Sequence, residues 1–277
     1  MAKFQFLLPL DGSMYSEIAA DNAVKIARMY NADVSTVHVV DTGIFEDPED
    51  IKTQTEFGQT LLDKYRQRCG DKGVDIVKAS ILVGSPFNEI IKMQKDIDAS
   101  LIILGAPDNK IGSTAERVVR GARCHVLIAR EKTAGDEPYK HILVPVDGSE
   151  DAEYAARFAA SIARRSASNL TACHVIQNLK KLPEGKAITK KVIDLAESKG
   201  IKAASIVREG EISEEILKAI DSEPFDLTVI GYTGRGRISR LILGSVSEKV
   251  IRSSSCSVLV VKSLRTERIY TVQKSQR

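Results

Sequence analysis

"HILVPVDGSEDAEYAARFAASIARRSASNLTACHVI" runs from His141 to Ile176 and carries the pattern that decides the fold. It begins with the apolar segment HILVPV and ends with a second, NLTACHVI, and each predicts a strand. Between them, apolar residues at 155, 156, 159, 162 and 163 recur at the spacing of one helix face. A strand, a helix and a strand in this order predict two parallel strands joined by a right-handed crossover.

The same alternation continues to residue 262. Further strands are predicted at IKAASIV (201–207), LTVI (227–230) and SVLVVK (257–262), with helical patterns between them. Continuous apolar strands such as LTVI are typical of a parallel sheet that is covered on both faces. We therefore expect a doubly wound α/β sheet, in which ligands bind beyond the carboxyl ends of the strands, where the winding reverses.

The sequence contains this pattern twice. LLPLDGS at 7–13 returns as LVPVDGS at 143–149, and GSTAERVVRGARCHVLIAR at 112–130 returns as GSVSEKVIRSSSCSVLVVK at 244–262. The polar segment EKTAGDEPYK separates the copies, and each copy has roughly the length of an ordinary single domain. We predict a first domain over residues 1–132, a second over 139–265 and a tail over 266–277.

Composition restricts the function classes. The 277 residues are 43% hydrophobic and 28% charged with a net charge of +3, which is an ordinary soluble mixture and too weakly basic to predict nucleic-acid binding. No apolar stretch approaches the ~20 residues that cross a bilayer, and no signal-peptide cleavage pattern follows the first residues. Four cysteines without a CxxC pair fit a reducing compartment. We expect a cytoplasmic protein with no membrane or nucleic-acid partner.

The segment GYTGRGRISRLILGS at 231–245 follows a predicted strand and opens a predicted helix. Its glycines would let the backbone approach a phosphate, and a helix N-terminus offers unpaired N–H groups and a positive dipole end. Ser245 and Ser247 would add hydroxyl donors, while Arg235 and Arg237 would neutralise phosphate charge. The segment is not a Walker A loop, because arginine and isoleucine stand where that motif has lysine and serine or threonine.

A plainer interpretation exists for each feature. The loop could be a solvated basic connection, Ser245 and Glu248 could form a capping box, and Asp147-Gly148-Ser149 could be only a strand-to-helix turn with a cap. His38 and His174 occupy equivalent positions in the two copies, which indicates packing. Cys124 and Cys256 are also equivalent, and buried packing fits them as well.

Taken together, these motifs resemble the universal stress protein family. The spacing Gly-x2-Gly-x9-Gly-Ser after the fourth strand is similar to its nucleotide-binding motif, and ILVPVDGSE, HVI, DLTVIGYTGRG and LILGSVSEKVIRSSSCSVLVVK follow in the family's order. The resemblance covers about residues 139–262 and, with weaker motifs, 3–130. It implies in each half a five-stranded parallel sheet in the order 3-2-1-4-5 with helices on both faces. Many members with this glycine motif bind ATP, and others lack the motif and do not.

The resemblance implies that the second half binds ATP, or ADP or AMP, with Mg or Mn held by the phosphates and no metal ligand from the protein. Asp147 and Val175 would line the adenine and ribose end, and the residues from 244 to 246 would hold the triphosphate. The expected nucleotide-binding residues are Pro145, Val146, Asp147, Val175, Ile230, Gly231, Tyr232, Gly234, Arg235, Gly236, Gly244, Ser245, Val246 and Ser247.

The first half retains only part of this motif. APDNKI stands where YTGRGRISRLIL stands in the second half, so that three arginines are lost and Asp108 adds negative charge. What survives is Asp11, Gly105, Gly112 and Ser113, and we interpret these four residues as a degenerate site. We therefore expect one ATP per chain.

On this evidence the protein is expected to be a stress-response signalling or protective module that acts on an unknown protein client. The alternatives are a slow ATPase or nucleotidyl transferase, and an interaction scaffold without nucleotide. No histidine lies between 175 and 277 to act as a general base, so we expect at most weak hydrolysis. The resemblance also implies that the final strands, around His125–Ala129 and Ser257–Val261, pair and make one chain mimic a dimer. It leaves open whether two chains form a homodimer.

Overall fold

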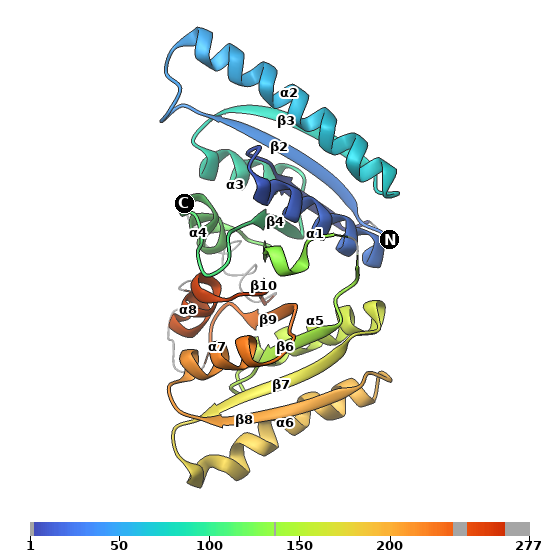
Figure 1. Cartoon of the computed structure of the whole chain (residues 1–277), viewed down its shortest axis with the longest axis vertical. Coiled ribbons are helices and arrows are strands. Elements are labelled where there is room, and N and C mark those ends of the chain that lie inside the picture. Colours follow the sequence, from blue (N-terminus) through green and yellow to red (C-terminus); the bar gives the residue numbers. More distant parts are fainter. Residues whose placement is uncertain (1–2, 136, 235–242, 264–277) are drawn as a thin grey trace, which may run out of the picture. The chain divides into compact units, whose positions relative to one another are not determined.

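The computed structural model describes residues 3–135, 137–234 and 243–263. The chain forms two compact units with the division between Glu137 and Pro138, apart from residues 108–110, which group with the second unit. Each unit is an α/β domain around a five-stranded parallel sheet (Figure 1). The expected tandem, doubly wound fold is confirmed. The predicted tail 266–277 lies outside the described residues, as do Arg235 and Gly236.

The first domain has its strands in the order β3-β2-β1-β4-β5, all parallel. The strands are β1 (Gln5–Pro9), β2 (Asp33–Asp41), β3 (Ile76–Gly84), β4 (Leu101–Gly105) and β5 (His125–Ala129). The helices are α1 (Met14–Tyr30), α2 (Pro48–Asp71), α3 (Pro86–Asp96) and α4 (Ser113–Gly121), and a 3-10 turn η1 (Glu131–Thr133) follows the last strand.

The second domain repeats this order as β8-β7-β6-β9-β10. Its strands are β6 (His141–Pro145), β7 (Asn169–Ile176), β8 (Ala203–Glu209), β9 (Leu227–Gly231) and β10 (Ser257–Val261). Its helices are α5 (Glu150–Ser166), α6 (Leu182–Glu197), α7 (Ile212–Ser222) and α8 (Ser245–Ser253), and a 3-10 turn η2 (Leu179–Lys181) precedes α6.

The order of the strands fixes which helices share a face. In the second domain the chain winds outward from β6 to β8 and then returns to β9, so right-handed crossovers place α5 and α6 on one face and α7 and α8 on the other. The contacts of α5 with α6 and of α7 with α8 agree, as Figure 1 shows. Every residue of β9 and β10 is buried, as the continuous apolar pattern predicts. The reversal lies between β6 and β9, and it opens the crevice at their carboxyl ends.

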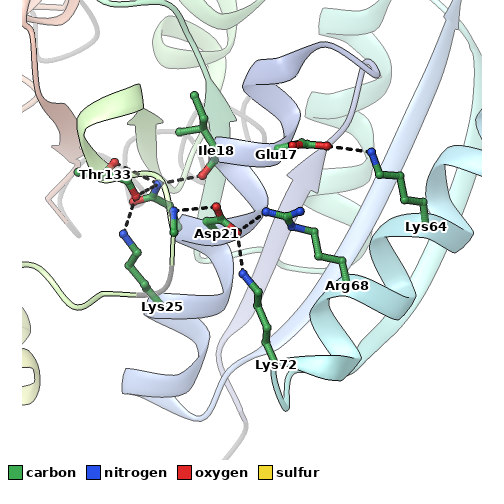
Figure 2. Close-up of polar contacts among 10 residues, drawn as sticks. Glu17, Ile18, Asp21, Lys25, Lys64, Arg68, Lys72 and Thr133 are labelled. Carbon is green, nitrogen blue, oxygen red and sulfur yellow. Dashed lines mark hydrogen bonds and ion pairs between the residues drawn. The ribbon is translucent and has the colours of Figure 1, made fainter.

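A polar cluster in the first domain ties α1 to α2 and to the segment after β5 (Figure 2). Asp21 on α1 is 4% exposed. Its Oδ1 accepts hydrogen bonds from Arg68 and Lys72 on α2, each at 2.9 Å, and its Oδ2 accepts one from the Gly135 amide at 2.8 Å. Burial would raise the pKa of Asp21, but these donors outweigh it and hold that pKa below its ordinary value. One carboxylate therefore joins three parts of the domain.

Candidate functional site

The carboxyl ends of β6, β7 and β9 and the N-terminus of α8 surround a cavity of about 410 Å³ in the second domain. This volume is in the range of pockets that hold small molecules and cofactors. The cavity lies at the reversal of the winding, where the fold predicts a ligand. The predicted residues in its lining are Pro145, Val146, Asp147, Val175, Ile230, Gly231, Gly234, Gly244, Ser245, Val246 and Ser247.

The turn after β6 has the plain geometry that its sequence allows. Asp147 Oδ1 accepts from the Ser149 amide at 2.9 Å, and Ser149 caps α5 by accepting from the Ala152 amide at 3.2 Å. Gly148 has a φ of 79°, which favours glycine. The turn is therefore confirmed as a capped strand-to-helix turn, and it also places Asp147 in the cavity wall.

Gly231 ends β9 where that strand meets the first turn of α5. A Cβ added to Gly231 would lie 3.0 Å from the backbone carbon and oxygen of Asp151. Gly105 in the first domain is still tighter, since its Cβ would lie 1.9 Å from the Tyr15 carbonyl oxygen. Helix–sheet packing alone therefore requires glycine at 105 and strongly disfavours any side chain at 231, where Gly231 lines the cavity with backbone atoms only.

The described residues place no such requirement on Gly244. Its φ of −62° and ψ of 141° suit any residue, and an added Cβ would have only ordinary contacts, the nearest at 3.4 Å from Ser247 Oγ. Because Gly244 lines the cavity, its missing side chain leaves space there. Packing against the described residues does not explain a glycine at this position, whereas a ligand that approaches the backbone closely would explain it.

Helix α8 begins differently from the sequence-based expectation. Gly244 is its N-cap residue, and within the described chain no side chain caps it. The predicted capping box of Ser245 and Glu248 is therefore wrong, and Glu248 instead pairs with Arg252 at 3.5 Å. The equivalent serine and glutamate of the first domain, Ser113 and Glu116, form no capping box either, since Gly112 is the N-cap of α4. The reason is that each serine has already entered the helix as its first residue, so its side chain cannot reach back as a cap.

This start leaves the positive end of α8 at the cavity. Ser245 and Val246 belong to its first turn, and both line the cavity. The amides of a first turn have no partner inside the helix, and the helix dipole adds roughly half a positive charge at this end. The arrangement suits an anion, and phosphate groups commonly bind at such helix starts.

Backbone contacts hold the two ends of the glycine-rich segment together. The Gly244 amide donates to the Tyr232 carbonyl at 3.0 Å, and the buried Ser247 hydroxyl donates to the Gly231 carbonyl at 2.8 Å. Ser247 was predicted as a ligand donor, and this bond gives it a structural role. At the other end, a Cβ on Gly234 would lie 2.8 Å from Asp147 Oδ2, so the segment starts beside that carboxylate.

The side chain of Tyr232 is directed elsewhere. It is 2% exposed, and the Lys262 ammonium lies 4.3 Å from the centre of its ring. Tyr232 is absent from the described lining of the cavity, contrary to its inclusion among the predicted residues. An aromatic residue between two glycines gave no sign in the sequence of which way its ring would turn.

The two equivalent histidines have the packing role that the repeat predicts. Nδ1 of His174 bonds to the Val146 carbonyl at 2.6 Å, and Nδ1 of His38 bonds to the Leu10 carbonyl at 2.8 Å. A glycine in the following helix lies against each ring: a Cβ on Gly185 would come within 2.9 Å of His174. Each bond joins the carboxyl ends of two neighbouring strands, and in the second domain His174 and Val146 also line the cavity.

Sequence reasoning missed several parts of the lining. Thr233 lines the cavity next to Gly234, and Ile212 and Ile216 reach it from α7. Lys181 and Glu184 also line it and form an ion pair at 3.0 Å. Helical periodicity shows which face of α7 is apolar, but it gives no indication that the first turn of that helix borders the crevice. The signal for Thr233 was its place inside the glycine motif.

The surviving residues of the first domain form a different arrangement. Asp11 Oδ1 accepts from the Ser13 amide and hydroxyl and from the Ser16 hydroxyl at 2.7–2.9 Å. Burial would raise the pKa of Asp11, but these bonds hold it below its ordinary value. A Cβ on Gly12 would lie 2.8 Å from the Phe57 ring. Gly112 still begins α4, with open space around its Cβ position.

Neither metal coordination nor membrane spanning is indicated by the described residues. Among them, no three His, Cys, Asp or Glu side chains gather in a way that could hold a metal ion. None of the described helices combines the length and apolar character needed to cross a membrane.

Comparisons with known proteins place these features in a family. The model of the universal stress protein family matches residues 5–130 and again 138–262. Universal stress protein MJ0531 of Methanocaldococcus jannaschii is 34% identical over 151 residues, covering 48% of this chain and 88% of that protein. Universal stress protein Rv2005c of Mycobacterium tuberculosis is 25% identical over 297 residues, covering 91% of this chain and 95% of that protein.

A solved structure has the same fold. The crystal structure of a universal stress protein from Archaeoglobus fulgidus aligns with a TM-score of 0.77 at 23% identity, covering 93% of this chain and 98% of that one. The two family matches together span most of the sequence, and each falls on one of the two α/β domains. This chain therefore belongs to the universal stress protein family, as a member with two tandem domains.

Proposed function

We propose that the second domain binds ATP, or the related ADP or AMP, in the cavity between β6, β9 and α8. The observation that carries the proposal is the start of α8, where the first-turn residues line a cavity and no side chain of the described residues caps the helix. Among the described residues, neither packing nor backbone conformation accounts for a glycine at 244, and a phosphate close to its backbone would account for one. A cationic ligand would be disfavoured by the positive end of the helix.

The remaining lining suits the nucleoside. Val146, Val175 and Ile230 offer apolar surface for a base. Asp147 has carboxylate oxygens that would accept hydrogen bonds from ribose hydroxyl groups. Mg or Mn would be held by phosphate oxygens, as is usual for a bound triphosphate. The expected neutralisation of phosphate charge by Arg235 and the expected nucleotide contact of Gly236 are also part of this proposal.

Calorimetric titration of Gly244→Asp with ATP tests the proposal. The new carboxylate would repel phosphate and fill the space that glycine leaves, so binding should weaken at least tenfold, equivalent to ~1.4 kcal/mol. Gly112→Asp is the matched control, because Gly112 is the N-cap of the equivalent helix and has open space around it. A folded Gly244→Asp protein with unchanged ATP affinity would overturn the assignment. Titration of the intact chain should also saturate near one equivalent, and a turnover assay should find at most weak hydrolysis.

We also propose that the protein acts in the cytoplasm as a nucleotide-dependent signalling or protective module in a stress response, through a protein client. Family membership supports this role. Complementation of a deletion strain by the wild-type protein, but not by Gly244→Asp, is the expected result. Equal rescue by both proteins would argue for an interaction scaffold that needs no nucleotide.

A further inference from the structure

Thr233, near the start of the glycine-rich segment 231–245, bonds to helix α5 through its side chain. The Thr233 hydroxyl donates a hydrogen bond to Asp151 Oδ2. Thr233 is 9% exposed and lines the cavity, whereas Asp151 is not among the described lining residues. Asp151 lies in the first turn of α5, directly where Gly231 packs against that helix. The contact therefore joins a cavity residue to a support outside the cavity.

This contact determines the position in space of the first residues of the glycine-rich segment. Thr233 stands between Tyr232, whose carbonyl accepts from the Gly244 amide, and Gly234, which lies against Asp147. When Thr233 is held in place, its two neighbours are held as well. These are the Tyr232 carbonyl, which accepts from the N-cap of α8, and Gly234, which lies beside Asp147. A shift of even 1 Å in these residues would displace the first-turn amides of α8, which are proposed to bind phosphate.

The first domain lacks both side chains that form this contact. Tyr15 stands at the position of Asp151, and Pro107 stands at that of Thr233. Ala115 replaces Ser247, so the hydroxyl that bonds to the Gly231 carbonyl is missing as well. Gly105 nevertheless packs against α1 as Gly231 does against α5. The fold thus forms without the contact, and the contact accompanies only the long glycine-rich segment.

An ordinary role for Asp151 is to favour the helix dipole from the first turn of α5. Glu150 and Glu153 already supply acidic residues in that turn. The dipole therefore does not explain why Asp151 bonds to Thr233. The dipole also gives no reason for a threonine at 233.

We propose that Asp151 and Thr233 are positioning residues of the nucleotide site, and that their hydrogen bond sets the affinity for the phosphate part of the ligand. This inference rests on the proposed ATP binding. Asp151 would act through Thr233 and would not touch the nucleotide. Because the bond orients the phosphate end of the cavity, its loss should weaken ATP binding more than adenosine binding.

The test compares ATP and adenosine affinities of the full chain by calorimetry. Thr233→Val and Asp151→Ala should each weaken ATP binding about five- to tenfold. Thr233→Ser and Asp151→Asn keep a donor and an acceptor, so they should restore affinity to within about twofold. The double variant Thr233→Val/Asp151→Ala should be no weaker than the weaker single variant, because both changes remove one contact.

Glu153→Ala is the control, because it removes an exposed carboxylate from the same turn of α5, where Glu153 pairs with Lys191 at 3.3 Å. It should leave ATP affinity unchanged. If the wild-type chain fails to bind ATP, the proposed function and this inference fall together. If the wild-type chain binds ATP, two results would overturn only the positioning role. Thr233→Val would bind ATP as tightly as the wild type, or it would lose adenosine affinity by the same factor as ATP affinity. Should Thr233→Val not fold, the comparison of Asp151→Ala with Asp151→Asn decides in the same way.

Discussion

Asp21→Ala is expected to destabilise the first domain strongly, and the structure provides a control on the same two helices. The change removes the single carboxylate that receives hydrogen bonds from Arg68, Lys72 and the Gly135 amide (Figure 2). Glu17, one turn earlier on α1, pairs with Lys64 at 2.8 Å. Both carboxylates join α1 to α2, so the two variants differ in burial and in the number of donors that the carboxylate receives.

The expected magnitudes follow from that difference. Removing one partner of a buried ion pair typically costs about 3–5 kcal/mol. The Asp21 side chain is 6% exposed, but those of Arg68 and Lys72 are 32% and 22% exposed, so water can solvate part of each cation that is left. We therefore expect Asp21→Ala to lower the free energy of unfolding by about 2–3 kcal/mol. The Glu17 and Lys64 side chains are 44% and 57% exposed, and Glu17→Ala should cost about 0.5 kcal/mol or less.

Urea denaturation of the full chain, followed by far-ultraviolet circular dichroism, measures both variants. Only the transition of the first domain should move to lower urea in Asp21→Ala, and hydrogen exchange should become faster in residues 131–135, which lose an anchor to α1. Equal destabilisation by Asp21→Ala and Glu17→Ala would refute the reasoning that burial and shared donors make Asp21 special.

Three further outcomes are expected. The folded-state pKa of Asp21 is lowered, so its stabilising effect is full above the unfolded pKa of about 3.9 and is lost as the pH falls through the folded pKa. The difference in unfolding free energy between the wild type and Asp21→Asn should therefore shrink in acid. A difference that widens in acid would contradict this. Burial raises the pKa of Cys69 to about 11 and that of Cys173 to about 12, so native protein at pH 8 should resist iodoacetamide at both thiols, as mass spectrometry would show. The family resemblance predicts that β5 and β10, each outermost within its own domain, pair with each other; slow hydrogen exchange at every amide of residues 257–261 is expected, and rapid exchange at alternate amides would count against the pairing.

The sequence by itself determined the fold and indicated where the candidate site lies. The alternation of apolar strands and helical patterns is local information, because each period reports which face of an element is buried. The repeat at 7–13 and 143–149 showed that the pattern occurs twice. The segment between Gly231 and Ser245 indicated an anion site because its glycines lie between a strand and a helix, and most of the residues predicted from it line one cavity.

Only the tertiary structure decided what each of those residues does. A glycine looks the same in sequence whether a neighbouring helix or a ligand excludes its side chain, and contact with Asp151 separates Gly231 from Gly244. The N-cap fell at Gly244 because cap position depends on backbone angles, which the S-x-x-E pattern does not specify. Asp21 and Gly135 lie 114 positions apart, and Ile212 reaches the cavity from α7. Periodicity identifies a buried face, but what packs against that face is settled only when the chain has folded.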